Sequence, residues 1–165
     1  MQLWRRGAAT AVDYALVGAW ALLLATLSVG LGGGRLFAQL SPVEGQLLGL
    51  ATLTVPMTLG IAAAEARGGS PGKRLLRLRL ETQGGGRVSF GTSLLRTAAK
   101  MALPWELAHV GVWQFAAGEG GTLAFAATAA AYATIAVTAI GVLHGLPWYD
   151  RLCRTRVRID RTADD

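Results

Sequence analysis

Three long stretches of the chain contain no charged residue. They run from Tyr14 to Gly34, from Gly45 to Ala64 and from Gly120 to Tyr149. The first stretch would be about 31 Å long as an α-helix, which matches the roughly 30 Å of hydrocarbon in a bilayer. Each stretch therefore predicts a membrane-spanning helix, with spans at about 10–34, 45–65 and 122–145.

A fourth stretch, from Met101 to Ala117, is apolar but contains Pro104, Glu106 and His109, so hydropathy alone does not decide whether it crosses. Cytoplasmic loops carry an excess of Lys and Arg, and this rule sets the orientation of the spans. Basic residues gather in three places: Arg5 and Arg6, then Arg67 to Arg96, then Arg151 to Arg161. Only an even number of crossings puts all three on one side, so a span at about 97–117 is predicted.

These patterns predict an all-α polytopic membrane protein, a four-span helical bundle formed by one domain over residues 1–165. We expect a bacterial cytoplasmic (inner) membrane, with both termini in the cytoplasm. A cleaved signal peptide ending near Leu36–Ala38 is the alternative interpretation of the start. Asp13 inside the apolar run and the full-span length of that run argue against it.

Two polar segments alternate apolar and basic residues, which is typical of a strand. Leu76 to Leu80 is the first, and Gly84–Gly86 predicts a turn after it, with Arg87 to Phe90 returning as a second strand. The tail from Cys153 to Asp160 alternates in the same way. We expect a cytoplasmic hairpin at about 73–91, joined by the tail (150–165) in a small sheet.

The basic side of that sheet has two interpretations. It would contact anionic lipid headgroups, at about 1 kcal/mol per residue near the surface, or its arginines only set the orientation of the spans. The candidate lipid contacts are Lys73, Arg74, Arg77 and Arg79.

Composition limits the classes of function. Hydrophobic residues make up 52% and charged residues 16% of the 165, so little chain remains for a soluble enzyme domain or a nucleic-acid-binding core, despite a net charge of +6. One cysteine and two histidines predict no metal site and no cofactor. The sequence contains neither a nucleophile–base pair nor a nucleotide-binding motif, so we do not expect an enzyme.

Some charges fall within or beside the predicted spans. Arg6 and Asp13 are seven residues apart, which is two helical turns on one face. Asp150 follows the last span, where the topology returns the chain to the same membrane level. A charged residue in a span is costly, so these side chains should face the bundle and find partners. We expect Arg6, Asp13 and Asp150 to form one ion network.

Glu106 and His109 lie three residues apart on one helix face. They would line a polar path together with Arg96, or form a core pair with Arg96 or Lys100.

The chain resembles the RDD membrane proteins, a family named for one arginine and two aspartates. The resemblance rests on four segments: Arg6–Ala9 leading to Val12-Asp13, Gly69–Leu76, Ser93–Arg96, and Asp150–Leu152 leading to Thr155–Val157. It implies that Arg6, Asp13 and Asp150 are the residues of the family name. Tyr149 stands where many members have a His.

The resemblance implies a role in transport, since some members are associated with sodium–proton exchange. Asp13 would then bind the proton or cation, with Asp150 supplying further oxygen ligands, and four spans would require a homo-oligomer. The rival hypothesis is a membrane scaffold in which the same three residues form a structural ion network.

Overall fold

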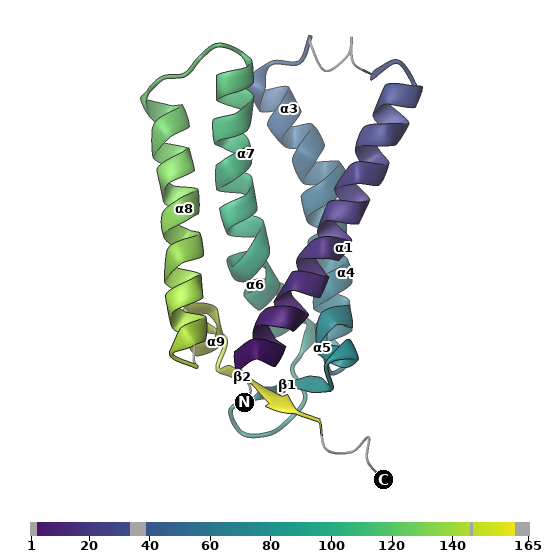
Figure 1. Ribbon diagram of the computed structural model, residues 1–165, viewed down its shortest axis with the longest axis vertical. Coiled ribbons are helices and arrows are strands. Elements are labelled where there is room, and N and C mark those ends of the chain that lie inside the picture. The colour runs from purple at the N-terminus through teal and green to yellow at the C-terminus, as the bar shows by residue number, and fades with distance from the viewer. Residues whose placement is uncertain (1–2, 34–38, 146, 161–165) are drawn as a thin grey trace.

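Helices make up most of the computed structural model, which describes residues 3–33, 39–145 and 147–160 (Figure 1). The cleavage point considered near Leu36–Ala38 lies outside these residues. In chain order the elements are α1 (Leu3–Gly30), α3 (Pro42–Gly49), η1 (Leu50–Thr54), α4 (Val55–Ala66), α5 (Pro71–Leu75), β1 (Leu78–Thr82), α6 (Phe90–Thr97), η2 (Ala98–Ala102), α7 (Leu103–Ala116), α8 (Thr122–Leu143), α9 (Trp148–Leu152) and β2 (Thr155–Ile159).

Three helices are long and apolar enough to cross a membrane. They are Leu3–Gly30, the continuous helix Pro42–Ala66, and Thr122–Leu143. They coincide with the three uncharged stretches and confirm those stretches as candidate membrane helices. Much of their surface consists of exposed Leu, Val, Ile and Phe side chains, as expected of helices that face lipid.

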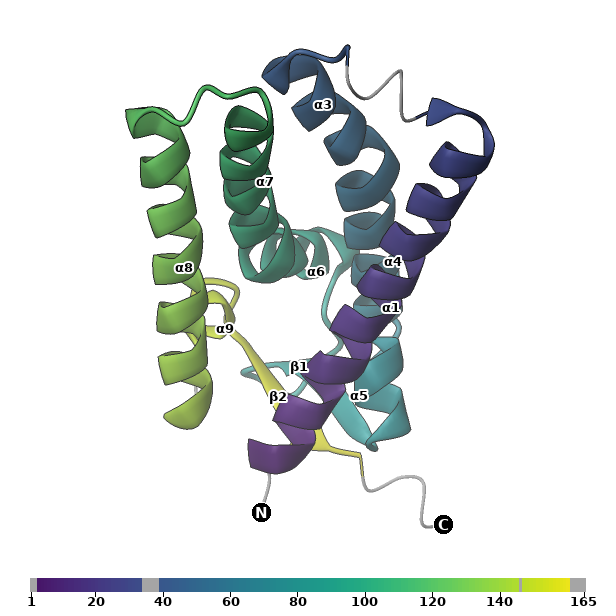
Figure 2. The ribbon, with the colours of Figure 1, turned by 45° about the horizontal axis from the view of Figure 1, so that its top comes forward.

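The helix formed by α6, η2 and α7 returns from the sheet end of the molecule and runs beside α8 (Figures 1 and 2). It is not among the candidate membrane helices of the described chain. Its length from Phe90 to Ala116 is sufficient to cross, but Arg96, Lys100 and Glu106 lower its hydropathy. The four-span bundle therefore stays a prediction, and the structure supports three spans.

A turn of π-helix lies just before a proline in each of two helices. Pro56 is the second residue of α4 and follows η1, and Pro104 is the second residue of α7 and follows η2. A proline inside a helix removes one hydrogen bond and clashes with the carbonyl four residues earlier. The wider π turn takes up this distortion while the helix continues.

The sheet has two strands from distant parts of the chain. β1 and β2 pair antiparallel, with Leu78 opposite Ile159 and Thr82 opposite Thr155. The predicted hairpin at 73–91 is wrong, because Pro71–Leu75 is the helix α5 and 86–89 forms no strand. The extended tail supplies the partner strand, and the segment after β1 leads into α6.

The molecule has two ends of different character. β1, β2, α5, α9 and the start of α1 gather at one end (Figure 1). The buried side chains Val17, Leu53, Ile61 and Met101 form an apolar cluster between α1, the Pro42–Ala66 helix and η2. This cluster separates the sheet end, where the buried charges lie, from the opposite half of the bundle.

Candidate functional site

Asp150 joins the start of α1 to α6 and β2. Arg6 Nη2 donates to Oδ2 of Asp150 at 3.1 Å, and Arg96 Nε donates to Oδ1 at 2.7 Å. The hydroxyl of Thr155 also donates to Oδ1, at 3.0 Å. Asp150 is fully buried. Its two oxygens therefore hold two cations and one hydroxyl in place of water, which offsets the cost of burying the charge.

Glu65, at the end of α4, holds two further cations. Nη1 of Arg96 lies 2.7 and 2.8 Å from its two carboxylate oxygens, and Nζ of Lys73 lies 2.6 Å from Oε1. Thr97 donates to Oε2 at 3.4 Å. Because Arg96 bonds to both Glu65 and Asp150, it connects the two carboxylates across the interior.

Asp13 has a different set of partners. Its Oδ2 accepts from the hydroxyl of Ser70 at 2.6 Å, and its Oδ1 accepts from the backbone N–H of Gly72 at 2.9 Å. Nζ of Lys73 is 3.9 Å from Oδ2. The side chain is fully buried. Asp13 therefore fastens α1 to the start of α5.

The local sequence explains this contact. Pro71 begins α5, and Ser70 precedes it with an extended backbone. A Cβ on Gly72 would overlap the backbone carbonyl of Ala9, so only glycine lets α1 approach this closely. The Gly-rich turn thus supplies two donors for the Asp13 carboxylate.

We call Arg6, Asp13, Glu65, Lys73, Arg96 and Asp150 the ion network. The expected triad is only partly joined in space. Arg6 contacts Asp150, whereas the hydrogen bonds and ion pairs of Asp13 within the described chain go to Ser70, Gly72 and Lys73. Arg96, expected on a polar path with Glu106, lies in this network instead.

Tyr149 packs against the ion network at Arg96. The carboxylates of Glu65 and Asp150 each bond to the Arg96 guanidinium, which favours its charged form. Burial is the main reason that the pKa of Tyr149 rises to about 12. The guanidinium lies 5.0 Å from the centre of the Tyr149 ring, a cation–π distance. Arg96 therefore stays charged and Tyr149 stays neutral.

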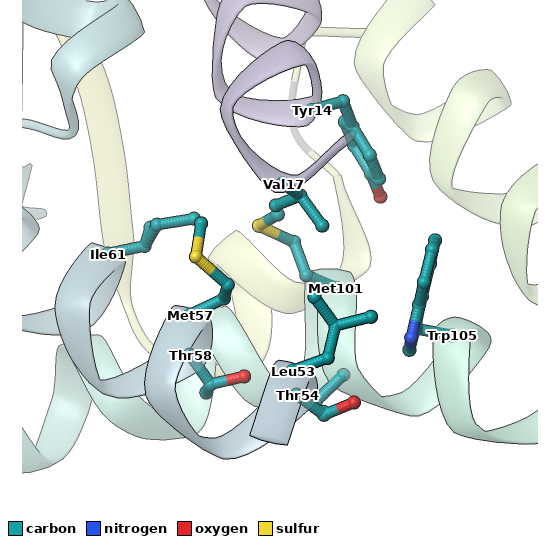
Figure 3. Close-up of a pocket in the computed structure, with 10 residues that line it drawn as sticks. Tyr14, Val17, Leu53, Thr54, Met57, Thr58, Ile61, Met101 and Trp105 are labelled. Atoms are coloured by element: carbon teal, nitrogen blue, oxygen red, sulfur yellow. The ribbon is translucent and has the colours of Figure 1, made fainter. Parts of the chain in front are cut away.

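The residues of the apolar cluster line a small pocket in the interior (Figure 3). Tyr14 and Val17 approach from α1, Leu53 and Thr54 from η1, and Trp105 from α7. The space between them is only about 20 Å³, close to the room one water molecule needs. The network and the opposite half of the bundle are therefore separated by packed side chains.

Glu106 lies on the other side of this cluster. Its carboxylate accepts from the side-chain amide of Gln46 and from the hydroxyl of Thr54. Thr54 lies midway along the candidate span Pro42–Ala66, so Glu106 is at the middle depth of the bundle. The predicted core pair with Arg96 or Lys100 is wrong, because the bonding partners of Glu106 among the described residues are these neutral groups.

Three side-chain atoms in this region are buried without a hydrogen bond within the described chain. They are Oε1 of Gln46, Nδ1 of His109 and Nε1 of Trp105. The His109 ring packs edge-on against Trp105, with ring centres 4.9 Å apart. Polar atoms buried in this way usually have a partner. The surroundings of Glu106 therefore contain both unpaired oxygen and unpaired nitrogen atoms.

The predicted lipid-contact residues divide into two groups. Lys73 is buried in the ion network and cannot face headgroups. Arg74 and Arg77 are exposed, and Arg79 is partly exposed. These three line a surface hollow of about 350 Å³, together with Arg67 and Asp160.

No group of three or more His, Cys, Asp or Glu residues is placed to hold a metal ion within the described ranges. Cys153 is buried, and burial raises the pKa of its thiol. A raised pKa leaves less of the reactive thiolate at neutral pH.

Sequence reasoning did not identify Glu65 as a site residue, although it is buried at the sheet end. Glu65 ends an uncharged run and was taken only as the boundary of a span. A charged residue at the end of a span beside the basic segment Arg67 to Arg96 is the signal that could have indicated a partner for Arg96. Lys100, expected as a core partner of Glu106 or His109, is buried one helical turn after Arg96.

A comparison with models of protein families matches residues 1–152 to the RDD family. No curated protein and no solved structure matches the chain. The matched range contains all six residues of the ion network and all three candidate membrane helices. Because this match covers most of the chain, the protein belongs to the RDD family and is an integral membrane protein.

Proposed function

We propose that the protein moves protons or small monovalent cations across a bacterial inner membrane, with Glu106 as the group that binds them. The observation that carries the proposal is the difference between the buried carboxylates. Asp13, Glu65 and Asp150 have cationic partners within 4 Å, whereas the partners of Glu106 are a neutral amide and a hydroxyl.

Exchange requires a carboxylate that is free to bind either a proton or a cation. Breaking a buried ion pair costs about 3–5 kcal/mol, so the carboxylates of the ion network are poor candidates. Glu106, Thr54 and Gln46 present neutral and anionic oxygens together, which suits a hard monovalent cation. The proposal therefore moves the exchange role from Asp13 to Glu106.

The proposed topology has four crossings, with α6, η2 and α7 forming the third and both termini in the cytoplasm. Arg6 in α1 bonds to Asp150 in α9, which supports an even number of passes between them. The arginines of the sheet end would then lie on the cytoplasmic side, as the positive-inside rule expects.

The test is cation-driven proton movement in proteoliposomes of purified protein. Wild type should give a sodium- or potassium-dependent signal, and Glu106→Gln should abolish it while the protein stays folded. Glu119→Gln is the matched control, because Glu119 is exposed in the turn before α8 and its loss should leave transport unchanged.

Asp13→Asn and Asp150→Asn decide between the two possible sites. We expect them to reduce heat stability, with transport retained by whatever protein remains folded. Loss of transport in folded Asp13→Asn, with full activity in Glu106→Gln, would contradict the proposal and return the role to Asp13.

A scaffold is the second candidate function. Two observations favour it. Asp13, Glu65 and Asp150 are all paired, which is typical of an ion network that holds helices together. The surface of the sheet end also has an arginine-lined hollow. Folded wild type without any cation-dependent signal would favour the scaffold over transport. Loss of a co-purifying partner after substitution of Arg74 and Arg79 would then support it.

A further inference from the structure

An apolar groove lies between the first half of α1 and the second half of α8. Its volume is about 510 Å³, which is in the range of ligand-binding pockets. On each helix the lining residues are spaced by three or four, so one face of each helix forms a wall. The lining consists of Gly7, Thr10, Tyr14, Lys100, Pro104, Ile135, Thr138, Ala139, Val142 and Leu143.

Lys100 is the charged residue of this lining. Its relative exposure is 4%, and it takes part in no hydrogen bond or ion pair among the described residues. It also lines a second, polar cavity of about 20 Å³ that contains Arg6, Lys73 and Arg96. The ammonium of Lys100 thus lies where the ion network meets the apolar groove.

In the interior of this end, four cations (Arg6, Lys73, Arg96, Lys100) face the three carboxylates of Asp13, Glu65 and Asp150. Each carboxylate has a closer cationic partner than Lys100. Among the described residues, no carboxylate forms an ion pair with Lys100, so an anion in the groove beside it would gain a charge pair that the interior does not supply.

We propose that the groove binds a long-chain fatty carboxylate, whose head group pairs with Lys100 and whose hydrocarbon chain lies between α1 and α8. The carboxylate pairs with Lys100 at the wall of the groove, and the apolar walls of α1 and α8 suit a single hydrocarbon chain. A charge-assisted bond to a carboxylate is among the stronger hydrogen bonds.

Trp148 provides a built-in reporter of occupancy. Its Nε1 donates to the hydroxyl of Thr138 at 3.0 Å, and Thr138 lines the groove. A fatty acid with bromine atoms on its chain should therefore quench the fluorescence of Trp148 when it binds. The test is a titration of the purified full-length protein in detergent with dibromostearate, with Trp148→Phe to identify the signal.

Wild type should show saturable quenching, and Lys100→Met should weaken binding by about tenfold or more, because it removes a charge-assisted bond. Ala139→Trp keeps Lys100 but fills the groove, so it should also abolish the saturable signal. Arg151→Gln, at an exposed cation outside the groove, should bind as wild type does. The uncharged methyl ester of the same acid should bind wild type no better than it binds Lys100→Met.

Three results would overturn the proposal. The first is equal binding of dibromostearate by wild type and folded Lys100→Met, which would mean that the Lys100 ammonium does not contribute to binding. The second is undiminished binding by Ala139→Trp, and it remains decisive if Lys100→Met fails to fold. The third is saturable quenching by a brominated phosphatidylglycerol but not by the fatty acid, which would assign the site to a phospholipid. The expected results do not depend on whether the protein moves cations.

Discussion

At the scale of single residues, Glu65 has the most cationic contacts in the ion network. Both of its oxygens accept from Arg96, and one also accepts from Lys73. All three side chains are buried. Their charges are therefore compensated by one another and not by solvent, which makes the network sensitive to the loss of any one member.

Glu65→Gln should destabilise the protein by about 3–5 kcal/mol, because it leaves two buried cations with an amide in place of a carboxylate. The measurement is the unfolding transition of the purified protein in detergent, followed by tryptophan fluorescence. Glu119→Gln serves as the control at an exposed carboxylate and should leave the transition unchanged. An unfolding midpoint for Glu65→Gln equal to that of wild type would mean that the network contributes little to stability.

The same scale shows what the sequence revealed of the candidate site. Counting the crossings predicted that Arg6 and Asp150 lie at the same depth in the membrane. The structure places the two side chains in contact. The partners of Asp13 did not follow, because Ser70 and Gly72 lie in a Gly-rich turn that looks like an ordinary connection. Any residue except proline can donate a hydrogen bond from its backbone N–H, so this contact could not be predicted from residue types and is seen only in the three-dimensional structure.

At the scale of elements, the sheet illustrates how local patterns and long-range pairing differ. Alternating residues indicated strands near β1 and β2, and the structure has strands there. The hairpin with 87–90 was wrong, since period-two alternation identifies a strand but not its partner. The actual partner lies more than seventy residues further along the chain, in the tail. The prediction that the tail joins the sheet is confirmed, but the alternation did not show that the tail is the direct partner of β1.

The register of the sheet can be tested through one cross-strand pair. Glu81 lies opposite Arg156, with carboxylate and guanidinium 3.8 Å apart and partly exposed. Glu81→Arg should destabilise the protein by about 0.2–1 kcal/mol through like-charge repulsion, and the double variant Glu81→Arg with Arg156→Glu should restore most of the loss.

Unfolding in detergent at low ionic strength is the appropriate measurement, because salt screens an exposed pair. Glu81→Arg with Arg151→Glu is the control, since Arg151 is exposed in α9, outside the sheet. Restoration by the control and not by the Arg156 double variant would contradict the register.

At the scale of the whole molecule, the start of α1 and the strand β2 lie at the same end (Figure 1). Three helices qualify as spans by length and composition. The sequence identified these three reliably, because uncharged runs of that length have few alternatives. It could not settle the α6–η2–α7 helix, whose charges point into the bundle and so do not exclude a crossing.

Topology can be tested with an impermeant maleimide on intact cells. Cys153 is a poor reporter because burial raises the pKa of its thiol, so it is replaced by Ser. In that background Gly120→Cys, in the exposed turn before α8, should label from outside, and Arg158→Cys, exposed on β2, should label only after permeabilisation. Labelling of Arg158→Cys in intact cells would contradict an even number of crossings.

The pairing of β1 with β2 also has a consequence for biosynthesis. A ribosome makes Glu65, Lys73 and Arg96 long before Asp150 and β2, so the early helices enter the membrane while Arg96 still lacks one of its two carboxylates. The last strand then supplies both the missing edge of the sheet and the Thr155 hydroxyl that donates to Asp150. A chain that stops short of α9 would leave Arg6 and Arg96 without Asp150. The order of synthesis thus leaves the ion network incomplete until α9 and β2 have been made.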